Sequence, residues 1–73
     1  MKFNVEMMAE KMVKLRGDRT LDEVAEALQI SKAALSMYEA GKRIPRDVIK
    51  LRIASYYGKS IGFIFFDVEE HGM

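Results

Sequence analysis

Hydrophobic side chains recur at three- and four-residue intervals along most of the chain, which is the spacing of one face of an α-helix. Polar residues that cap helices, and glycines that end them, separate these segments. The pattern predicts helices over residues 5–16, 21–29, 32–40, 46–57 and 61–66. We therefore expect an all-α fold, a compact five-helix bundle.

Several residues predict where these helices begin. Thr20 and Glu23 stand three residues apart, as in a capping box. Phe3 precedes the first helix and faces Met8, as in a hydrophobic staple. Side chains that can accept a hydrogen bond from a first-turn amide stand just before four of the helices, at Asn4, Thr20, Ser31 and Ser60.

Only a few residues link the second predicted helix to the third. Two short helices joined so tightly must cross at a steep angle, which is the geometry of a helix-turn-helix. We expect the crossing to be buried by Ala27, Ile30, Leu35 and Tyr38. The residues after Gly41 should form an exposed loop, because Pro45 prevents an immediate return to helix.

The fourth predicted helix has a less regular pattern. It carries Val48, Leu51 and the segment from Ile53 to Tyr56, and Ile49 beside Val48 is apolar too, so the spacing does not define its rotation. Gly58 should end it in a left-handed conformation.

Size and composition exclude several classes of protein. A chain of 73 residues holds one domain, and its lack of cysteine excludes disulfides and thiolate zinc sites. The first residues lack the features of a signal peptide, and no stretch is long enough to span a membrane, so we expect a cytoplasmic protein. The only histidine is His71 and no Gly-rich phosphate loop is present, so we expect no enzyme, cofactor or metal.

Charge is distributed unevenly along a chain whose net charge is only +1. Residues 60–73 carry acidic side chains and no lysine or arginine, and residues 67–73 should form a flexible acidic tail after a domain of residues 1–66. The segment 31–52 is rich in basic side chains, namely Lys32, Lys42, Arg43, Arg46, Lys50 and Arg52. A polyanion would dock there, although a charged segment can equally be a solvated face.

The segment 20–45, TLDEVAEALQISKAALSMYEAGKRIP, resembles the helix-turn-helix core of the Cro and phage-repressor family, also called the XRE family. The stretch IASYYGKSIGFIF resembles the closing helices of that family. Residue types match the family pattern at Thr20, Glu23, Ala25, Leu28, Ile30, Ser31, Leu35, Ser36, Tyr38, Glu39, Gly41, Arg43 and Pro45. The resemblance implies a DNA-binding transcriptional regulator, in particular a repressor, with its helix-turn-helix in residues 20–40.

The resemblance implies that the third helix enters the major groove of double-stranded DNA. The candidate base-reading residues are Lys32, Ala33, Ser36 and Met37. Lysine can donate to guanine, and the apolar side chains can contact a thymine methyl group. The alternatives are an ordinary solvated lysine, an alanine chosen for helix propensity, and a methionine in the core.

Phosphate contacts are expected around this helix. Helix N-termini bind anions, which points to Thr20 and Ser31, whose other role is capping. The basic candidates are Lys42, Arg43, Arg46 and, more weakly, Lys14. Glu39 lies near Arg43 in the sequence and should be structural, because a carboxylate facing phosphate would be repelled.

Two residues depart from the family pattern before and at the start of the second helix. Leu21 replaces a common phosphate-binding glutamine and cannot make that contact. Arg19 replaces a usual leucine, so the preceding loop is either more open or gains a phosphate contact.

The last predicted helix contains four consecutive apolar residues, Phe63 to Phe66. We expect Phe63, Ile64 and Phe66 to form the interface of a symmetric homodimer that reads two half-sites about 34 Å apart. The alternative is that Ile61, Ile64 and Phe65 close the core while the other two phenylalanines shield its edge. A rival function is a protein-binding adaptor or inhibitor, antitoxin-like or a phage-encoded control protein, that docks through this aromatic end.

Overall fold

The structure, a computed structural model, describes residues 4–66 and contains five α-helices in this part of the chain, as predicted. They are α1 (Val5–Arg16), α2 (Leu21–Leu28), α3 (Lys32–Glu39), α4 (Asp47–Tyr57) and α5 (Ile61–Phe65). The predicted all-α class is confirmed, and the predicted ends differ by about one residue. The predicted staple at Phe3 and the acidic tail of residues 67–73 lie outside the described residues.

Four helices begin with the side-chain caps that the sequence predicts. The carbonyl oxygen of the Asn4 side chain and the hydroxyls of Thr20, Ser31 and Ser60 each accept a first-turn amide at 2.9–3.0 Å. The capping box at Thr20 is only half formed, because the Glu23 carboxylate returns no hydrogen bond in the described part of the chain. α4 begins after Arg46 without a side-chain cap.

Four helices are followed by a residue with positive φ, and the residue after α2 is unusual because it is not a glycine. Gly41 and Gly58 adopt positive φ after α3 and α4, where they carry no Cβ that would clash. The equivalent residue after α2 is Gln29, at φ 59°. The amides of Gln29 and Ile30 bond back to carbonyls of α2 at 3.1 and 3.0 Å, which closes the helix in a Schellman motif.

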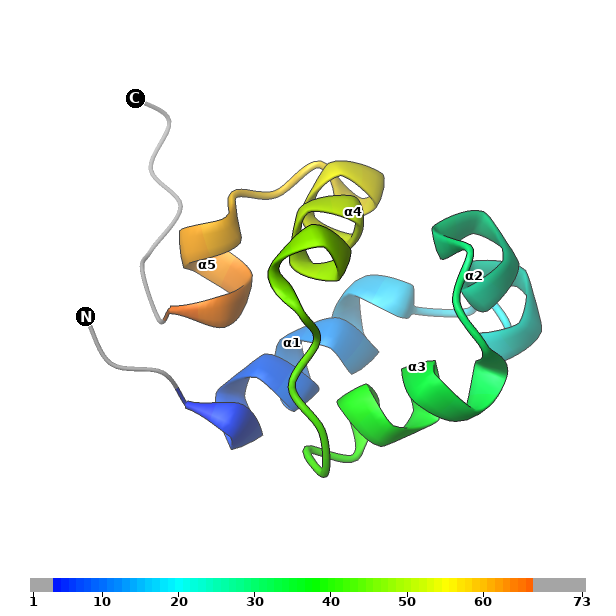
Figure 1. Ribbon diagram of the computed structural model, residues 1–73, viewed down its shortest axis with the longest axis horizontal. Coiled ribbons are helices and arrows are strands. Elements are labelled where there is room, and N and C mark those ends of the chain that lie inside the picture. The colour runs from blue at the N-terminus through cyan, green and yellow to red at the C-terminus, as the bar shows by residue number, and fades with distance from the viewer. Residues whose placement is uncertain (1–3, 67–73) are drawn as a thin grey trace.

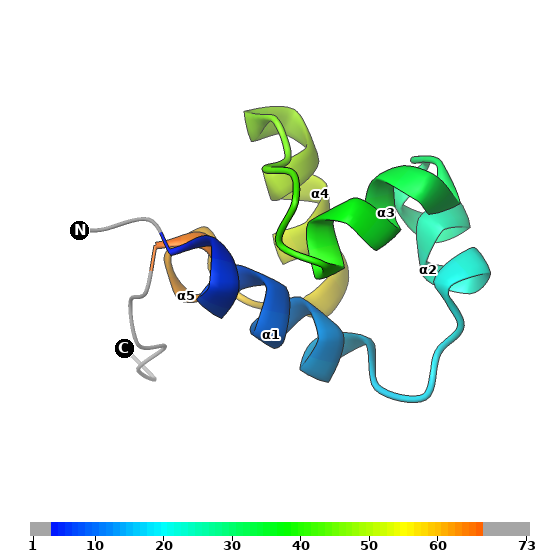
Figure 2. The ribbon, with the colours of Figure 1, turned by 90° about the horizontal axis from the view of Figure 1, so that it is seen from below.

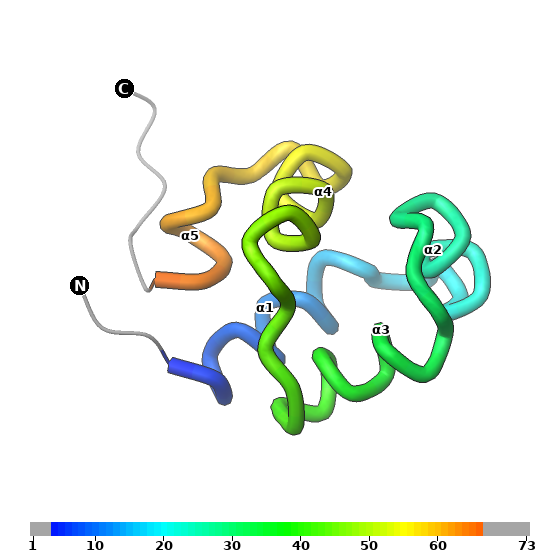
Figure 3. Tube along the Cα trace, in the orientation of Figure 1, coloured from blue at the N-terminus to red at the C-terminus, as the bar shows by residue number. Residues whose placement is uncertain are grey.

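The helices are arranged with the helix-turn-helix at one end of the molecule. Figures 1 and 2 both place α2 and α3 at one end and α5 at the other. α1 packs against α3 and α5, and α4 packs against α2 and α5. Figure 3 shows the segment between α3 and α4 passing in front of α1. Two scaffold helices therefore connect the helix-turn-helix to α5.

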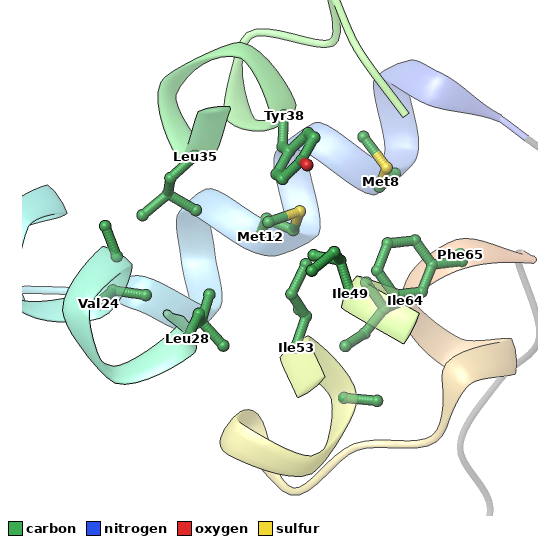
Figure 4. Packing of buried hydrophobic residues seen from close by; sticks show 12 residues of the cluster. Met8, Met12, Val24, Leu28, Leu35, Tyr38, Ile49, Ile53, Ile64 and Phe65 are labelled. Atoms are coloured by element: carbon green, nitrogen blue, oxygen red, sulfur yellow. The ribbon is translucent and has the colours of Figure 1, made fainter. Parts of the chain in front are cut away.

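All five helices contribute to one hydrophobic core, in which side chains from α1, α3, α4 and α5 point toward a common centre (Figure 4). Fully buried apolar side chains each contribute about 1.5–3 kcal/mol to stability. The largest of them are Met8, Met12, Val24, Leu28, Leu35, Ile53, Ile64 and Phe65. The three- and four-residue spacing of apolar side chains therefore does mark the buried faces of α1 and α2.

One of the four residues predicted to bury the crossing of α2 and α3 does not: Ala27 is exposed. Leu35 and Tyr38 are buried as predicted and Ile30 is half-buried, while α2 contributes Val24 and Leu28 to the same core. α2 therefore packs against α3 with the face that carries its larger apolar side chains, Val24 and Leu28.

The structure decides the rotation of α4, which the sequence pattern leaves open. Val48 and Leu51 are 50% and 57% exposed, whereas Ile49, Ile53 and Ala54 face the core. Apolar residues occur on more than one side of α4, so their spacing alone does not define the buried face. α4 therefore presents an exposed apolar face to the solvent.

The aromatic segment of α5 is largely satisfied within one chain. Ile64 is 1% exposed and Phe65 is equally buried, so Ile64 cannot be an interface residue as predicted. The ammonium groups of Lys11 and Lys59 lie 4.3 and 5.6 Å from the centre of the half-buried Phe63 ring. Cation–π contacts of this kind stabilise an aromatic edge without a second chain.

We predict that Gln29→Gly raises the free energy of unfolding by about 0.5–1 kcal/mol, because glycine relieves the cost of a left-handed Cβ by more than it adds in chain entropy. Urea denaturation measures the change. Gln29→Ala is the matched control: it retains the Cβ and should give no increase. An equal gain in both variants would contradict the role of backbone strain.

Candidate nucleic-acid interface

The turn between α2 and α3 fixes how α3 is presented. Gln29 ends α2 in a left-handed conformation, and Ser31 caps α3 two residues later. Leu35 and Tyr38 hold one side of α3 in the core. The opposite side of this eight-residue helix is therefore left on the surface.

All four predicted base-reading residues lie on that exposed side. Lys32, Ala33 and Ser36 are exposed. Met37 is 40% exposed, so it is not a core residue, and the interpretation of Met37 as packing is ruled out. An apolar side chain on a polar surface is a candidate contact point.

Lys32 has a partner on α2. Its ammonium lies 3.5 Å from a carboxylate oxygen of Asp22, and both side chains are largely exposed. Exposed ion pairs of this kind contribute little to stability. The pair therefore matters chiefly for where the Lys32 ammonium is held.

The N-termini of α2 and α3 carry Thr20 and Ser31. Their predicted capping role is confirmed, since each hydroxyl accepts an amide of the first turn. The remaining first-turn amides have no acceptor within the helix. Such amides, together with the helix dipole, favour an anion at each terminus.

The loop between α3 and α4 carries Lys42, Arg43 and Arg46, all of them exposed as predicted. None of the three makes a side-chain hydrogen bond or ion pair with another described residue. Arg43 and Arg46 line the same hollow, whose volume is about 550 Å³. Lys14 is not brought to this hollow and lies beside Glu39 between α1 and α3.

Glu39 joins three parts of the scaffold. Its two carboxylate oxygens accept hydrogen bonds from the Arg16 side chain at 2.9 and 3.1 Å, and Arg16 also donates to the backbone carbonyl of Arg19 at 2.7 Å. Hydrogen bonding to Glu39 raises the pKa of Arg16. The structural role predicted for Glu39 is confirmed, but its partner is Arg16 of α1 and not the nearby Arg43.

Tyr57 lies close to this ion pair. Its hydroxyl is buried and has no hydrogen-bond partner in the described residues. Burial, followed by the charge of Glu39, raises the pKa of Tyr57 to about 12. Arg19 lies over the rings of Tyr56 and Tyr57 at 5.3 and 5.7 Å, so it packs on aromatic residues at the end of α4.

Arg52 is a functional candidate that sequence reasoning missed. It donates from α4 to the backbone carbonyls of Leu28 and Gln29 at 3.1 and 3.5 Å, which ties α4 to the helix-turn-helix. Membership of the basic segment 31–52 was its only signal in the sequence. No spacing rule could place it at the end of a helix more than twenty residues earlier.

Within residues 4–66, no helix combines the length and apolarity needed to cross a membrane. The same residues contain no cluster of three or more acidic or histidine side chains that could hold a metal ion.

Comparisons with known proteins agree with this geometry. The sequence matches the helix-turn-helix family over residues 8–64. The fold is similar to the crystal structure of a transcriptional regulator from Listeria innocua, with a TM-score of 0.77 and 22% sequence identity. The similarity covers 97% of this chain and 65% of the Listeria chain, so this chain spans slightly less than two thirds of that protein. No match is found among curated proteins.

We predict that Tyr57→Phe stabilises the protein at pH 7 by up to about 1 kcal/mol, because it removes a buried hydroxyl without a partner. The pKa of the phenol is near 10 in the unfolded chain and about 12 in the folded chain. Ionisation of the phenol therefore leaves the free energy of unfolding unchanged below pH 10 and lowers it as the pH rises toward 12. After allowance for partial exposure, this loss should be about 1–2 kcal/mol and absent from the variant.

Urea denaturation at pH 7 and above pH 10 measures both effects. Tyr56→Phe is the control, because its hydroxyl is not enclosed in this way. If the free energy of unfolding falls equally above pH 10 in Tyr57→Phe and in the unaltered protein, the Tyr57 phenol is not the cause of that fall.

Proposed function

From its membership of the helix-turn-helix family of Cro and phage-repressor proteins, we propose that the chain is a sequence-specific, double-stranded DNA-binding transcriptional regulator. We further propose that it acts as a repressor and binds as a homodimer in the cytoplasm, at the nucleoid. The observation that carries this proposal is the exposed side of α3, which is bordered by capped helix N-termini and an unpaired basic loop.

In this proposal α3 enters the major groove, which admits one α-helix. Lys32 donates to guanine, and Asp22 holds its ammonium near the start of the helix. Ala33 and Met37 contact thymine methyl groups, and Ser36 donates or accepts at a base edge. These four side chains supply the sequence preference.

Phosphate contacts hold the helix in register. The first-turn amides at Thr20 and Ser31 approach the backbone of the DNA, while Lys42, Arg43 and Arg46 bind phosphates from the loop after α3. Lys14 makes a weaker, peripheral contact. A protein held over a promoter in this way blocks access to it, which is the physical basis of the proposed repression.

The proposed homodimer uses α4 and not the centre of the aromatic segment. Val48 and Leu51 lie one turn apart on α4 and are half exposed, and Ile44 is also exposed in the preceding loop. Leu51 and Phe66 line one hollow, so Phe66 extends this surface at its edge. Exposed apolar patches of this kind mark sites of association.

No contact favours the rival function as an adaptor that docks through α5. Lys11 and Lys59 cover the Phe63 ring, and Lys11 also donates to the Phe63 carbonyl. This end of the molecule offers less free apolar surface than α4.

Selection of genomic fragments with the purified protein at near-physiological salt tests DNA reading. We expect a palindromic site to be enriched, and Lys32→Ala plus Met37→Ala to weaken binding to that site by about ten- to a hundredfold. Weak binding to unrelated DNA should persist, because the phosphate contacts remain.

Lys59→Ala plus Val13→Ala is the matched control, since it removes one lysine and one exposed apolar side chain away from α3. It should retain site affinity. Failure to enrich any sequence at any salt concentration would reject the proposed function.

Sedimentation equilibrium tests the dimer. We expect Leu51→Glu to raise the dimer dissociation constant by at least about tenfold, because it places a charge in an apolar contact. Val13→Glu makes the same change at an exposed position on α1 and should have no effect. Monomer at all concentrations, or equal weakening by both variants, would contradict a dimer through α4.

A further inference from the structure

A hollow beside the helix-turn-helix gathers three arginines. It lies between the turn after α2, the loop after α3 and the outer side of α4, and its volume is about 550 Å³. Arg43 and Arg46 come from the loop and Arg52 comes from α4. The rest of the lining is Gln29, Tyr38 and four aliphatic residues, of which Ile44 and Val48 also belong to the proposed dimer surface and the other two are Ile30 and Ile49. These residues are distant in the sequence and meet only in the folded chain.

The charge of this hollow is entirely positive. None of the residues that line it is acidic. The carboxylate of Asp47, at the start of α4, faces solvent and pairs with Lys50 at 3.6 Å. Arg43 and Arg46 have no carboxylate partner in the described chain, so their charges are uncompensated.

Arg52 differs from the other two because it is already oriented. One nitrogen, Nη1, donates to the carbonyls of Leu28 and Gln29, and these bonds occupy only part of the guanidinium. A guanidinium has five N–H donors in a fixed plane. Arg52 therefore keeps donors for a second acceptor, at little further cost in side-chain entropy.

The backbone adds a further feature. Arg46 is the N-cap residue of α4 and provides no side-chain cap, so the first amides of this eleven-residue helix lack a side-chain acceptor. Uncapped amides and the positive end of a helix dipole favour an anion.

We propose that this hollow binds a phosphate group through Arg43, Arg46 and Arg52. Guanidinium groups match phosphate oxygens in pairs, and three of them without a nearby acid favour a group that carries more than one charged oxygen. The phosphate comes either from the DNA backbone, in which case the site rests on the proposed function and adds Arg52 to it, or from a phosphorylated small molecule.

The first test is an NMR titration of the full chain with inorganic pyrophosphate at constant ionic strength. Amide signals of Gln29, Arg43 and Arg46 should shift. Arg52→Gln and Arg43→Gln should each weaken binding by about tenfold, whereas Arg52→Lys, which keeps a charge and a donor, should retain most of it. Arg19→Gln is the control, because Arg19 lies over Tyr56 and Tyr57 outside the hollow.

The second test measures DNA affinity as a function of salt. Loss of one phosphate contact reduces the slope of log K against log salt concentration by about 0.9. Arg52→Gln should show this reduction if the phosphate belongs to DNA. A purely structural role for Arg52 would lower affinity without changing the slope, and Arg43→Gln provides a second variant that leaves the bonds to α2 intact.

The two tests separate the sources of the phosphate. Weaker pyrophosphate binding with a reduced slope supports a DNA phosphate, and weaker pyrophosphate binding with an unchanged slope supports a small phosphorylated molecule. Unchanged pyrophosphate binding in both glutamine variants, with an unchanged slope, overturns the site. A protein that binds no DNA would reject the proposed function, while the pyrophosphate titration would still decide the hollow.

Discussion

The position of α3 depends on the ion pair between Arg16 and Glu39. The carboxylate lies in the last turn of α3, 7% of its side chain is exposed, and the Nε of Arg16 donates to both of its oxygens. Because Arg16 also holds the carbonyl of Arg19, one guanidinium ties α1, α3 and the loop before α2 together. Breaking such a pair from one side leaves a charge without its partner, which commonly costs about 3–5 kcal/mol when the pair is buried.

A helix with the role proposed for α3 needs this kind of support because most of its own surface must stay free. Leu35 and Tyr38 are the only residues of α3 that lie fully in the hydrophobic core. Two apolar contacts define the depth of the helix in the core but constrain its rotation less well. The polar anchor at Glu39 and the capped turn at Ser31 fix the two ends of α3 and leave its middle exposed.

The sequence predicts those elements whose information is local. α1 and α2 each carry one apolar stripe, so their buried faces follow from spacing, and capping residues locate the first turns of four helices. α4 defeats the same reasoning because Val48 and Ile49 are neighbours on different faces, and only packing decides which one is buried. Spacing identifies apolar residues but does not tell which of two apolar faces meets the core.

Some residues of the candidate site could also be predicted from local sequence, and others could not. The exposed side of α3 could be predicted, because one helical face carries Leu35 and Tyr38 and the other does not. The partners of Glu39 and Arg52 could not, because these contacts join residues more than twenty positions apart. Gln29 gives no local signal either, since glutamine is not a residue that favours positive φ.

The low net charge of this chain makes the arrangement of its charges important. A protein with a net charge of +1 has little long-range attraction for DNA, so binding depends on where its cations are free. Folding assigns Lys11 and Lys59 to aromatic rings, Arg16 to Glu39 and part of Arg52 to the end of α2. Among the described residues, Lys42, Arg43 and Arg46 keep no carboxylate partner in the loop after α3, next to the exposed helix, and neither does Lys14 on α1. The long-range attraction of the whole protein for DNA is weak, and only a few side chains are placed to contact phosphates. In the proposed function, most of the affinity would therefore come from contacts to base edges at the preferred DNA sequence.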